Sequence, residues 1–257
     1  MTTGFNDQYT KYGSYEHEIA RGKIRGAKLF YSFGEIDTSG AVTDHIIWPM
    51  TGTPELTVPT GIQMNISSTS VNDTSAGSGV RTVKIQYLDA NLDEQTEVIS
   101  MNGTTAVNTV ATDIRFVNGM HITSGGVDKE AQGDISLKNG AVTYAQILTG
   151  KRRCTSSARR VPRNKRLMIT SLYCGGSSGT ADASAMVRLV TTGVNSDDFT
   201  SDSITFPHAG IAIQDSSATL SLTMPFPVAE GQVVGLEVTT DKSAMIDAGF
   251  VGWIEDV

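Results

Sequence analysis

The chain has 257 residues, of which 39% are hydrophobic and 18% are charged, and its formal net charge is −7 at pH 7. Abundant Gly, Ser and Thr with few charges disfavour a helical bundle or coiled coil, and recurring Val, Ile, Leu and Phe disfavour a disordered chain. No apolar run approaches the roughly 20 residues that span a bilayer, and the first fifteen residues lack the apolar segment of a secretion signal. Cys154 and Cys174 cannot form the disulfide framework of a small secreted domain. We therefore expect an all-β protein that is made in a reducing cytoplasm, with both thiols free. If the two cysteines pair instead, the bridge would clamp the loop between two adjacent strands.

Residues 1–27 differ from the rest of the chain, because aromatic side chains recur in a polar stretch that four glycines interrupt. Those glycines disfavour a helix, so an extended N-terminal arm is expected. Its rings would anchor on a neighbouring subunit, because aromatic residues dominate interface energetics, or would pack on the arm's own domain. The candidate partner-binding residues of the arm are Phe5, Tyr9, Tyr12, Tyr15, Arg21 and Arg25.

Residues 28–138 are predicted to form a first β domain. Val83, Ile85 and Tyr87 alternate with polar residues, which indicates a strand with one buried face. Asn102-Gly103 predicts a hairpin, and Asn118-Gly119 predicts a turn that closes a strand. Turn signals recur roughly every 8–12 residues, as is typical of a β-sandwich or barrel.

Residues 139–257 are predicted to form a second β domain. Residues 142–148 are expected to be a helical turn or a linker, and Pro225 and Pro227 are expected to lie in a loop. The candidate strands cover residues 167–174, 186–191, 203–206, 219–224, 233–239 and 245–254. The expected fold is all-β, with two antiparallel β-sandwich or jelly-roll-like domains and an extended N-terminal arm.

Residues 175–179, Gly-Gly-Ser-Ser-Gly, match the G-x-S-x-G pattern of a serine nucleophile at Ser177. Asp197 or Asp198 and then His208 follow in the order of a catalytic triad. A nucleophile elbow requires a strand before the serine and a helix after it. Residues 186–190 alternate as a strand does, so a hairpin loop is the favoured interpretation.

Two partial metal motifs are incomplete. His17-Glu18 begins a zinc motif, but Arg21 occupies the place of the second histidine. A calcium-like loop begins at Asp89, but Glu94 replaces the required glycine and Ser100 replaces the required glutamate. We therefore expect no enzyme activity, no catalytic residue, no metal site and no cofactor.

The basic residues are concentrated in one part of the chain, and no Asp or Glu occurs between Asp134 and Asp182. Residues 161–165, Val-Pro-Arg-Asn-Lys, are predicted to form a hairpin tip, which would put the charge on a protruding edge. A contact between subunits of an acidic oligomer is the preferred interpretation, and a merely solvated edge that its charges protect from aggregation remains open. Nucleic acid is disfavoured, because the stretch lacks stacking aromatics and a recognition helix. The residues of this basic edge are Lys151, Arg152, Arg153, Arg159, Arg160, Arg163, Lys165 and Arg166.

Residues 67–83, 87–91 and 101–107 together resemble a group of virion structural proteins of tailed bacteriophages. In that group an Ile-Trp pair, here Ile47-Trp48, precedes the β domain, and a second β domain carries a Val-Pro-x-x-Lys turn, here residues 161–165. The resemblance covers about residues 20–175 and departs where Arg163-Asn164 replaces a small or glycine-containing loop. It implies a place in the virion after synthesis in the bacterial host cytoplasm, and it carries over no catalytic residue.

The favoured hypothesis is a capsid decoration or cement subunit, a homo-oligomer that contacts itself and other virion proteins through its arm and basic edge. A tail-associated role, in a collar, baseplate or fibre attachment, is the alternative. A carbohydrate-binding surface module would use Trp48 and Trp253 as platforms. A hydrolase using Ser177 is the least favoured hypothesis, and neither a membrane nor a nucleic-acid partner is expected.

Overall fold

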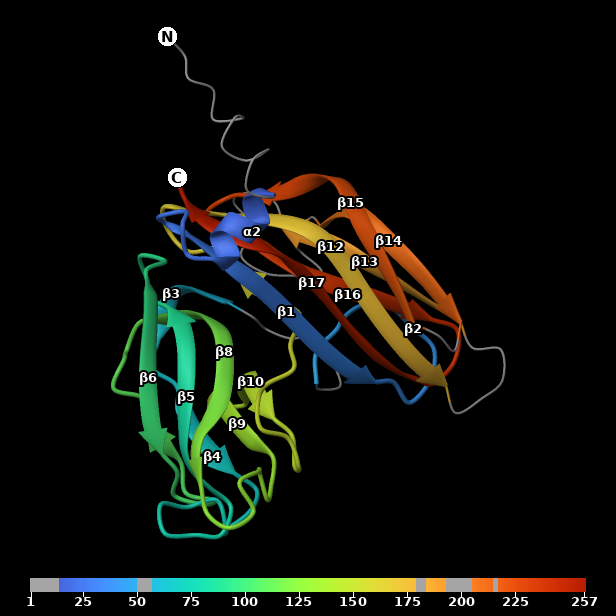
Figure 1. Cartoon of the computed structure of the whole chain (residues 1–257). Coiled ribbons are helices and arrows are strands. Elements are labelled where there is room, and N and C mark those ends of the chain that lie inside the picture. Colours follow the sequence, from blue (N-terminus) through green and yellow to red (C-terminus); the bar gives the residue numbers. More distant parts are fainter. Residues whose placement is uncertain (1–13, 50–56, 179–183, 193–204, 215–216) are drawn as a thin grey trace.

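The computed structural model describes residues 14–49, 57–178, 184–192, 205–214 and 217–257 (Figure 1). Of the residues that the structure describes, 62% are in strands and 3% in helix, and the strands form several antiparallel sheets. The all-β prediction is therefore confirmed. Within the described ranges, no helix has the length and apolar character needed to cross a membrane.

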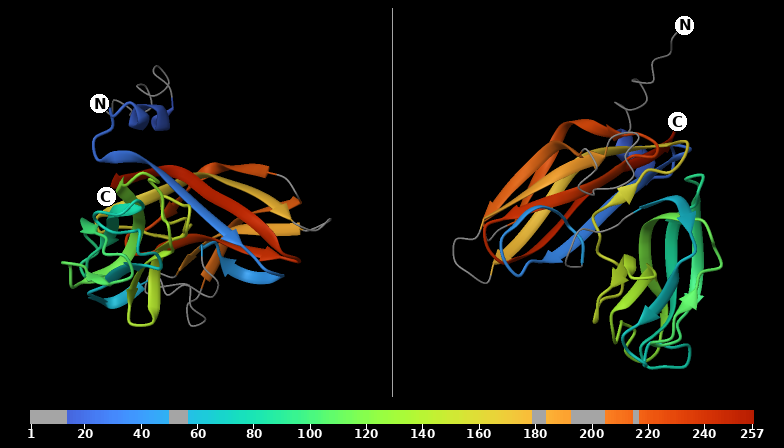
Figure 2. Two further views of the ribbon diagram at one scale, coloured as in Figure 1. Left: turned by 90° about the horizontal axis from the view of Figure 1, so that it is seen from below. Right: turned by 180° about the vertical axis from the view of Figure 1, so that it is seen from behind.

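Eight strands form a jelly roll of two sheets (Figures 1 and 2). Numbered within this unit alone, the sheets have the strand orders 1-8-3-6 and 2-7-4-5, which is the arrangement of a double-sheet jelly roll. The first sheet has the order β1 (Ala27–Asp37), β17 (Ala244–Asp256), β12 (Lys165–Ser178) and β15 (Ser217–Val228). The second has the order β2 (Val42–Ile46), β16 (Val233–Thr240), β13 (Ser184–Thr192) and β14 (Thr205–Gln214), and the short β11 (Arg159–Arg160) also pairs with β16.

The jelly-roll core lies between these two sheets, because alternate residues of each strand point inward. Ile246 and Phe250 of β17 and Leu189 of β13 are almost completely buried there. On the other face of the first sheet, the Tyr173 hydroxyl donates to the Ser32 carbonyl at 2.8 Å. A Cβ atom at Gly249 would collide with this hydroxyl, so the crossing of the tyrosine over β17 requires glycine.

A second β-sandwich is inserted in the chain between β2 and β12. One of its sheets has the order β3 (Thr57–Ile62), β8 (Ile114–Gly125), β5 (Val80–Leu88) and β6 (Glu94–Ser100). The other has the order β10 (Val142–Ile147), β9 (Ile135–Asn139), β4 (Asn65–Ser68) and β7 (Val107–Asn108). Val83, Ile85 and Tyr87 point into its core, which confirms the alternation expected for this strand.

The observed strand pairing divides the chain differently from the expected boundaries at residues 27/28 and 138/139. β1 and β2 pair with the C-terminal strands β17 and β16, whereas β9 and β10 belong to the inserted sandwich. The chain leaves the jelly roll after Ile47 and returns at Ser157, whose N–H donates to the Ile47 carbonyl at 3.0 Å. Pairing between segments about 200 residues apart leaves no local pattern in the sequence, and this is why the boundaries differ.

The jelly roll and the inserted sandwich share a small apolar cluster. Ile46 and Val233 of the jelly roll pack in one cluster with Leu88 and Phe116 of the sandwich, and Trp48, at the start of the insertion, belongs to the same cluster. The Arg163 N–H also donates to the carbonyl of Leu92, in the β5–β6 turn, at 2.9 Å. The two units are therefore in direct contact.

Several local expectations differ from the structure. Residues 142–147 form β10, which follows β9 through the Asn139-Gly140 turn, where Gly140 has φ +58°. Asn102-Gly103 connects β6 to β7, which lie in different sheets, so it forms no hairpin. Pro225 and Pro227 lie in β15, which is an edge strand and therefore tolerates proline.

Two further turn signals have other roles. Asn118-Gly119 lies inside β8, at a register shift opposite Gln86 and Tyr87, and is therefore a bulge. Residues 161–165 connect β11 in one jelly-roll sheet to β12 in the other. This segment is a corner between sheets, so the prediction of a hairpin tip was wrong.

Candidate functional site

The first part of the predicted arm, with Phe5, Tyr9 and Tyr12, lies outside the described residues. Tyr15 begins the short helix α2 (Tyr15–Ala20), which the glycine-interrupted sequence did not predict. Its ring packs edge-on against Trp253 with centroids 5.3 Å apart, and its hydroxyl donates to Glu255 at 3.2 Å. Tyr15 therefore covers the protein's own jelly roll.

The two arginines predicted for the arm lie at and after the end of α2. Arg21 forms an ion pair with Glu18 at 3.3 Å, within the same turn of the chain, and Arg25 is exposed. A role for either in binding a neighbour remains a prediction.

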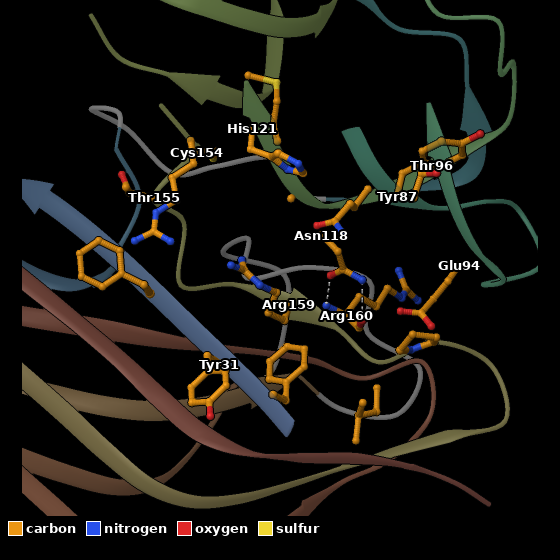
Figure 3. A pocket seen from close by; sticks show the side chains of 18 of the residues that line it. Tyr31, Tyr87, Glu94, Thr96, Asn118, His121, Cys154, Thr155, Arg159 and Arg160 are labelled. Atoms are coloured by element: carbon orange, nitrogen blue, oxygen red, sulfur yellow. Dashed lines mark hydrogen bonds between the residues drawn. The ribbon is translucent and has the colours of Figure 1, made fainter. Parts of the chain in front are cut away.

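A cleft of about 970 Å³ separates β1 of the jelly roll from β5, β6 and β8 of the sandwich (Figure 3). We call it the interdomain cleft. Tyr31, Phe33 and Glu35 line it from β1, and Asn118 and His121 line it from β8. We call residues 150–162, over which the chain passes back to the jelly roll, the return segment. Residues 150–155 and 159–162 of this segment line the cleft.

Hydrogen bonds to main-chain carbonyls of the return segment hold it on both sides of the cleft. The Arg152 carbonyl accepts from the Ile122 N–H at 3.0 Å, which ties the segment to β8. The Thr155 carbonyl accepts from the Glu35 N–H at 2.9 Å, and the Ser157 carbonyl accepts from the Ser32 hydroxyl at 2.8 Å, which ties it to β1. The main chain that carries the basic residues is thereby held beside β1.

Part of the predicted basic edge lines this cleft. The Lys151 ammonium lies 2.7 and 2.9 Å from the two Glu35 carboxylate oxygens. The Arg153 guanidinium lies 5.4 Å from the centre of the Phe33 ring, which is a cation–π distance. Arg152 is exposed beside them.

Arg159 and Arg160 lie deeper in the interdomain cleft. Nη1 of Arg159 donates to the carbonyls of Ser156 and Ala158 at 2.8 and 2.6 Å, and burial lowers the pKa of Arg159. Arg160 is only 4% exposed, and its main-chain N–H and carbonyl bond the Asn118 side chain at 2.9 and 3.0 Å (Figure 3). The expectation that all eight basic residues lie on a protruding edge is therefore wrong.

The remaining three basic residues do not line the cleft. Lys165 forms an ion pair with Asp256, while Arg163 and Arg166 are exposed near the corner between the jelly-roll sheets. The basic residues are close together in the sequence but are divided in the structure between the cleft and this corner. The reason is that the chain enters the jelly roll here and turns from one of its sheets to the other.

The β1 wall of the cleft was not predicted from the sequence. Lys28 of β1 lies 3.6 Å from Glu94 of β6, so this pair connects the two units across the cleft. Tyr31 is 63% exposed although it belongs to a strand of the jelly roll. The aromatic run of Phe30, Tyr31 and Phe33, which follows the predicted arm, is the signal in the sequence that could have indicated this wall.

The hydrolase residues do not form an elbow. Ser177 lies within β12, paired with Met245 of β17, so the strand continues through the position where a turn is required. His208 contacts the Thr191 hydroxyl at 2.8 Å and packs on Phe226, and Asp197 and Asp198 lie outside the described residues.

The candidate calcium loop and the candidate sugar-binding tryptophans also lack the arrangement that such sites require. Asp89 accepts hydrogen bonds from the main-chain N–H groups of Asn91 and Asp93, as a turn residue does, and the described residues contain no cluster suited to a metal ion. Trp48 and Trp253 are 3% and 7% exposed, so neither presents a platform for a sugar.

The two cysteines are unpaired, as expected. Cys174 is buried and Cys154 is half-buried, and burial raises the pKa of both thiols.

The sequence matches no protein-family model and no curated protein. A chain in the structure of infectious bursal disease virus, Gt strain, aligns with 90% of this chain and 72% of its own length, at 10% identity and a TM-score of 0.23. A chain of the same virus's VP2 subviral particle aligns over 91% and 82%, at 11% identity and a TM-score of 0.12. Similarity at such low TM-scores supports no inference about fold or function. The fold is therefore assigned from the strand order described above.

Proposed function

We propose that the protein is a structural component of a virion, namely a capsid decoration or cement subunit that forms homo-oligomers. The observation that carries the proposal is the jelly roll with a second β-sandwich inserted in it. Double-sheet jelly rolls are common in viral capsid proteins, although they also occur in lectins and cupins. Fold alone does not determine function, so this support is an analogy at the level of the fold.

The contact between the two units also supports a structural role. The shared apolar cluster and the paired hydrogen bonds between Asn118 and Arg160 restrain the sandwich relative to the jelly roll. A restrained two-part block can transmit contacts between neighbours in a lattice. In this proposal the basic residues of the interdomain cleft and the aromatic residues of the N-terminal segment make those contacts.

The test is the copy number of the protein in purified virions of the phage that encodes it, measured by quantitative mass spectrometry against the major capsid protein. A count that scales with the capsid lattice supports a decoration or cement subunit. A much smaller count supports the tail-associated alternative and excludes the capsid position. Absence from the virion would refute both structural roles.

A further inference from the structure

One edge of β1 faces the interdomain cleft. β1 is an edge strand of its sheet, and it pairs with β17 from Ala27 to Asp37 without a register shift. In an antiparallel pair, the main-chain groups of successive residues point alternately toward and away from the partner strand. The Glu35 N–H points away from β17, because it donates to the Thr155 carbonyl of the return segment.

By this alternation, Tyr31 and Phe33 also direct their main-chain N–H and carbonyl groups away from β17. Within the described part of the chain, these outward N–H groups have no hydrogen-bond partner. Both residues line the cleft, and Tyr31 is mostly exposed. This stretch of the β1 edge is therefore open to pairing with another strand.

The cleft has room for such a strand. Its volume of about 970 Å³ lies at the upper end of the roughly 300–1,000 Å³ typical of ligand pockets. Figure 3 shows β1 along one side of this space and the side chains of the sandwich along the other.

The charge of the cleft indicates which kind of added strand would bind there. Six lysine and arginine residues line it against two glutamates, Glu35 and Glu94, and each glutamate is already paired with a lysine. Arg152, Arg153 and Arg159 have no carboxylate partner among the described residues. An acidic segment would satisfy this excess of positive charge.

We propose that the interdomain cleft binds an extended acidic segment of a neighbouring protein, which adds to the edge of β1 as a fifth strand of its sheet. In strand addition, main-chain hydrogen bonds provide affinity and the surrounding side chains provide specificity. Here the arginines of the return segment select acidic side chains. This inference deepens the proposed function and depends on it for the source of the segment.

Peptide binding by the full-length protein tests the inference without virions. The probe is a fluorescein-labelled peptide of alternating Glu and Val, measured by fluorescence anisotropy. One control peptide replaces Glu with Gln, and another keeps Glu but carries N-methyl groups on alternate main-chain nitrogens. We expect the acidic peptide to bind, each control to bind about tenfold more weakly or worse, and binding to weaken with added salt.

A matched pair of variants tests the role of the β1 edge. Tyr31→Pro removes the outward N–H, whereas Tyr31→Ala removes the side chain and keeps the N–H. Proline is tolerated at an edge position whose N–H is not used in the sheet. We expect Tyr31→Pro to bind the acidic peptide about tenfold more weakly than Tyr31→Ala.

Equal binding by the two variants would overturn strand addition, and so would equal binding of the acidic and N-methylated peptides. The peptide comparison decides the matter if Tyr31→Pro does not fold. A single-stranded oligonucleotide that binds the cleft when the acidic peptide does not would also overturn the inference. If the peptide fails to bind but the protein is abundant in virions, the inference fails and the proposed function stands.

Discussion

Among single residues, Asp73 has the most extensive set of hydrogen bonds in the inserted sandwich. Its side chain is fully buried, and Oδ1 accepts from the N–H groups of Val80 and Gln132 at 2.8 and 3.1 Å. Oδ2 accepts from the Ser68 hydroxyl at 2.6 Å and from the Gly133 N–H at 3.0 Å. One carboxylate thus connects the end of β4, the start of β5 and the loop before β9.

We expect Asp73→Ala to lower the free energy of unfolding by at least about 3 kcal/mol. The substitution leaves three main-chain N–H groups without their acceptor, and each such buried group costs roughly 1–3 kcal/mol. Urea denaturation measures the change. Asp128→Ala, at an exposed position, is the control and should shift stability by less than about 0.5 kcal/mol. Equal effects of the two substitutions would contradict this account of Asp73.

We expect His121 to make the stability of the protein depend on pH. Burial lowers the pKa of His121, and the Lys84 charge lowers it further. The unfolded chain therefore binds more protons than the folded chain just below the ordinary histidine pKa of about 6.5. The stability from this site is complete above that pH and is lost as the pH falls through the lower pKa of the folded state.

We expect the free energy of unfolding to decrease as the pH falls below about 6.5, and to decrease less steeply in His121→Gln. Burial also lowers the pKa of His208, so adding His208→Gln should flatten the dependence further. Urea titrations at a series of pH values give the slopes. An unchanged slope in the double variant would show that other groups cause the dependence.

At the scale of elements, the bulge in β8 connects the two units. Asn118 lies at the register shift opposite Gln86 and Tyr87, and its amide bonds both main-chain groups of Arg160. Bulges redirect side chains, and this one directs Asn118 out of the sandwich toward the jelly roll. The same Asn-Gly pair in the sequence indicates a turn, because the signal reports the local backbone and carries no information about the partner strand.

We expect Asn118→Ala to reduce stability by about 1–3 kcal/mol, because it removes two hydrogen bonds to partly buried main-chain groups. It should also make the unfolding of the two units less cooperative, which would lower the apparent dependence of the unfolding free energy on urea. Asn108→Ala, at an exposed position in β7, is the control. A wild-type unfolding curve for Asn118→Ala would indicate that the apolar cluster alone connects the units.

Sequence patterns predicted the positions of individual strands better than they predicted which strands pair with one another. The alternation of Val83, Ile85 and Tyr87 follows from one buried face, and it is local. The pairing of β1 with β17 joins residues more than 200 positions apart, and neither strand carries a mark of the other. The interdomain cleft is formed by this pairing and by the path of the return segment. The basic residues of the cleft could be identified from the sequence because they are close together in the chain. Its β1 wall could not, because its position depends on the distant strand β17.

At the scale of the whole molecule, we expect α2 to contribute to folding and the residues before it to contribute to assembly. Tyr15 covers Trp253, and Ile19 is buried, so α2 is part of the jelly-roll structure. Phe5, Tyr9 and Tyr12 precede it in the chain. Under the proposed function, these three aromatic residues bind a neighbouring subunit.

We expect removal of residues 1–13 to leave thermal stability unchanged and to reduce incorporation into virions. Removal of residues 1–27 should also destabilise the fold by about 3 kcal/mol, because it uncovers Trp253 and removes the buried Ile19. Differential scanning calorimetry and tryptophan fluorescence distinguish the two truncations. Normal incorporation of the shorter truncation would refute a binding role for its aromatic residues.

The entry and exit points of the inserted sandwich have an evolutionary consequence. Ile47 and Ser157 are hydrogen-bonded neighbours, so the insertion begins and ends at one place on the jelly roll. The jelly roll can therefore keep its strand register while the inserted segment is exchanged, lengthened or replaced by recombination at these two points. Related chains could then share the same base and present different outer modules to the surroundings.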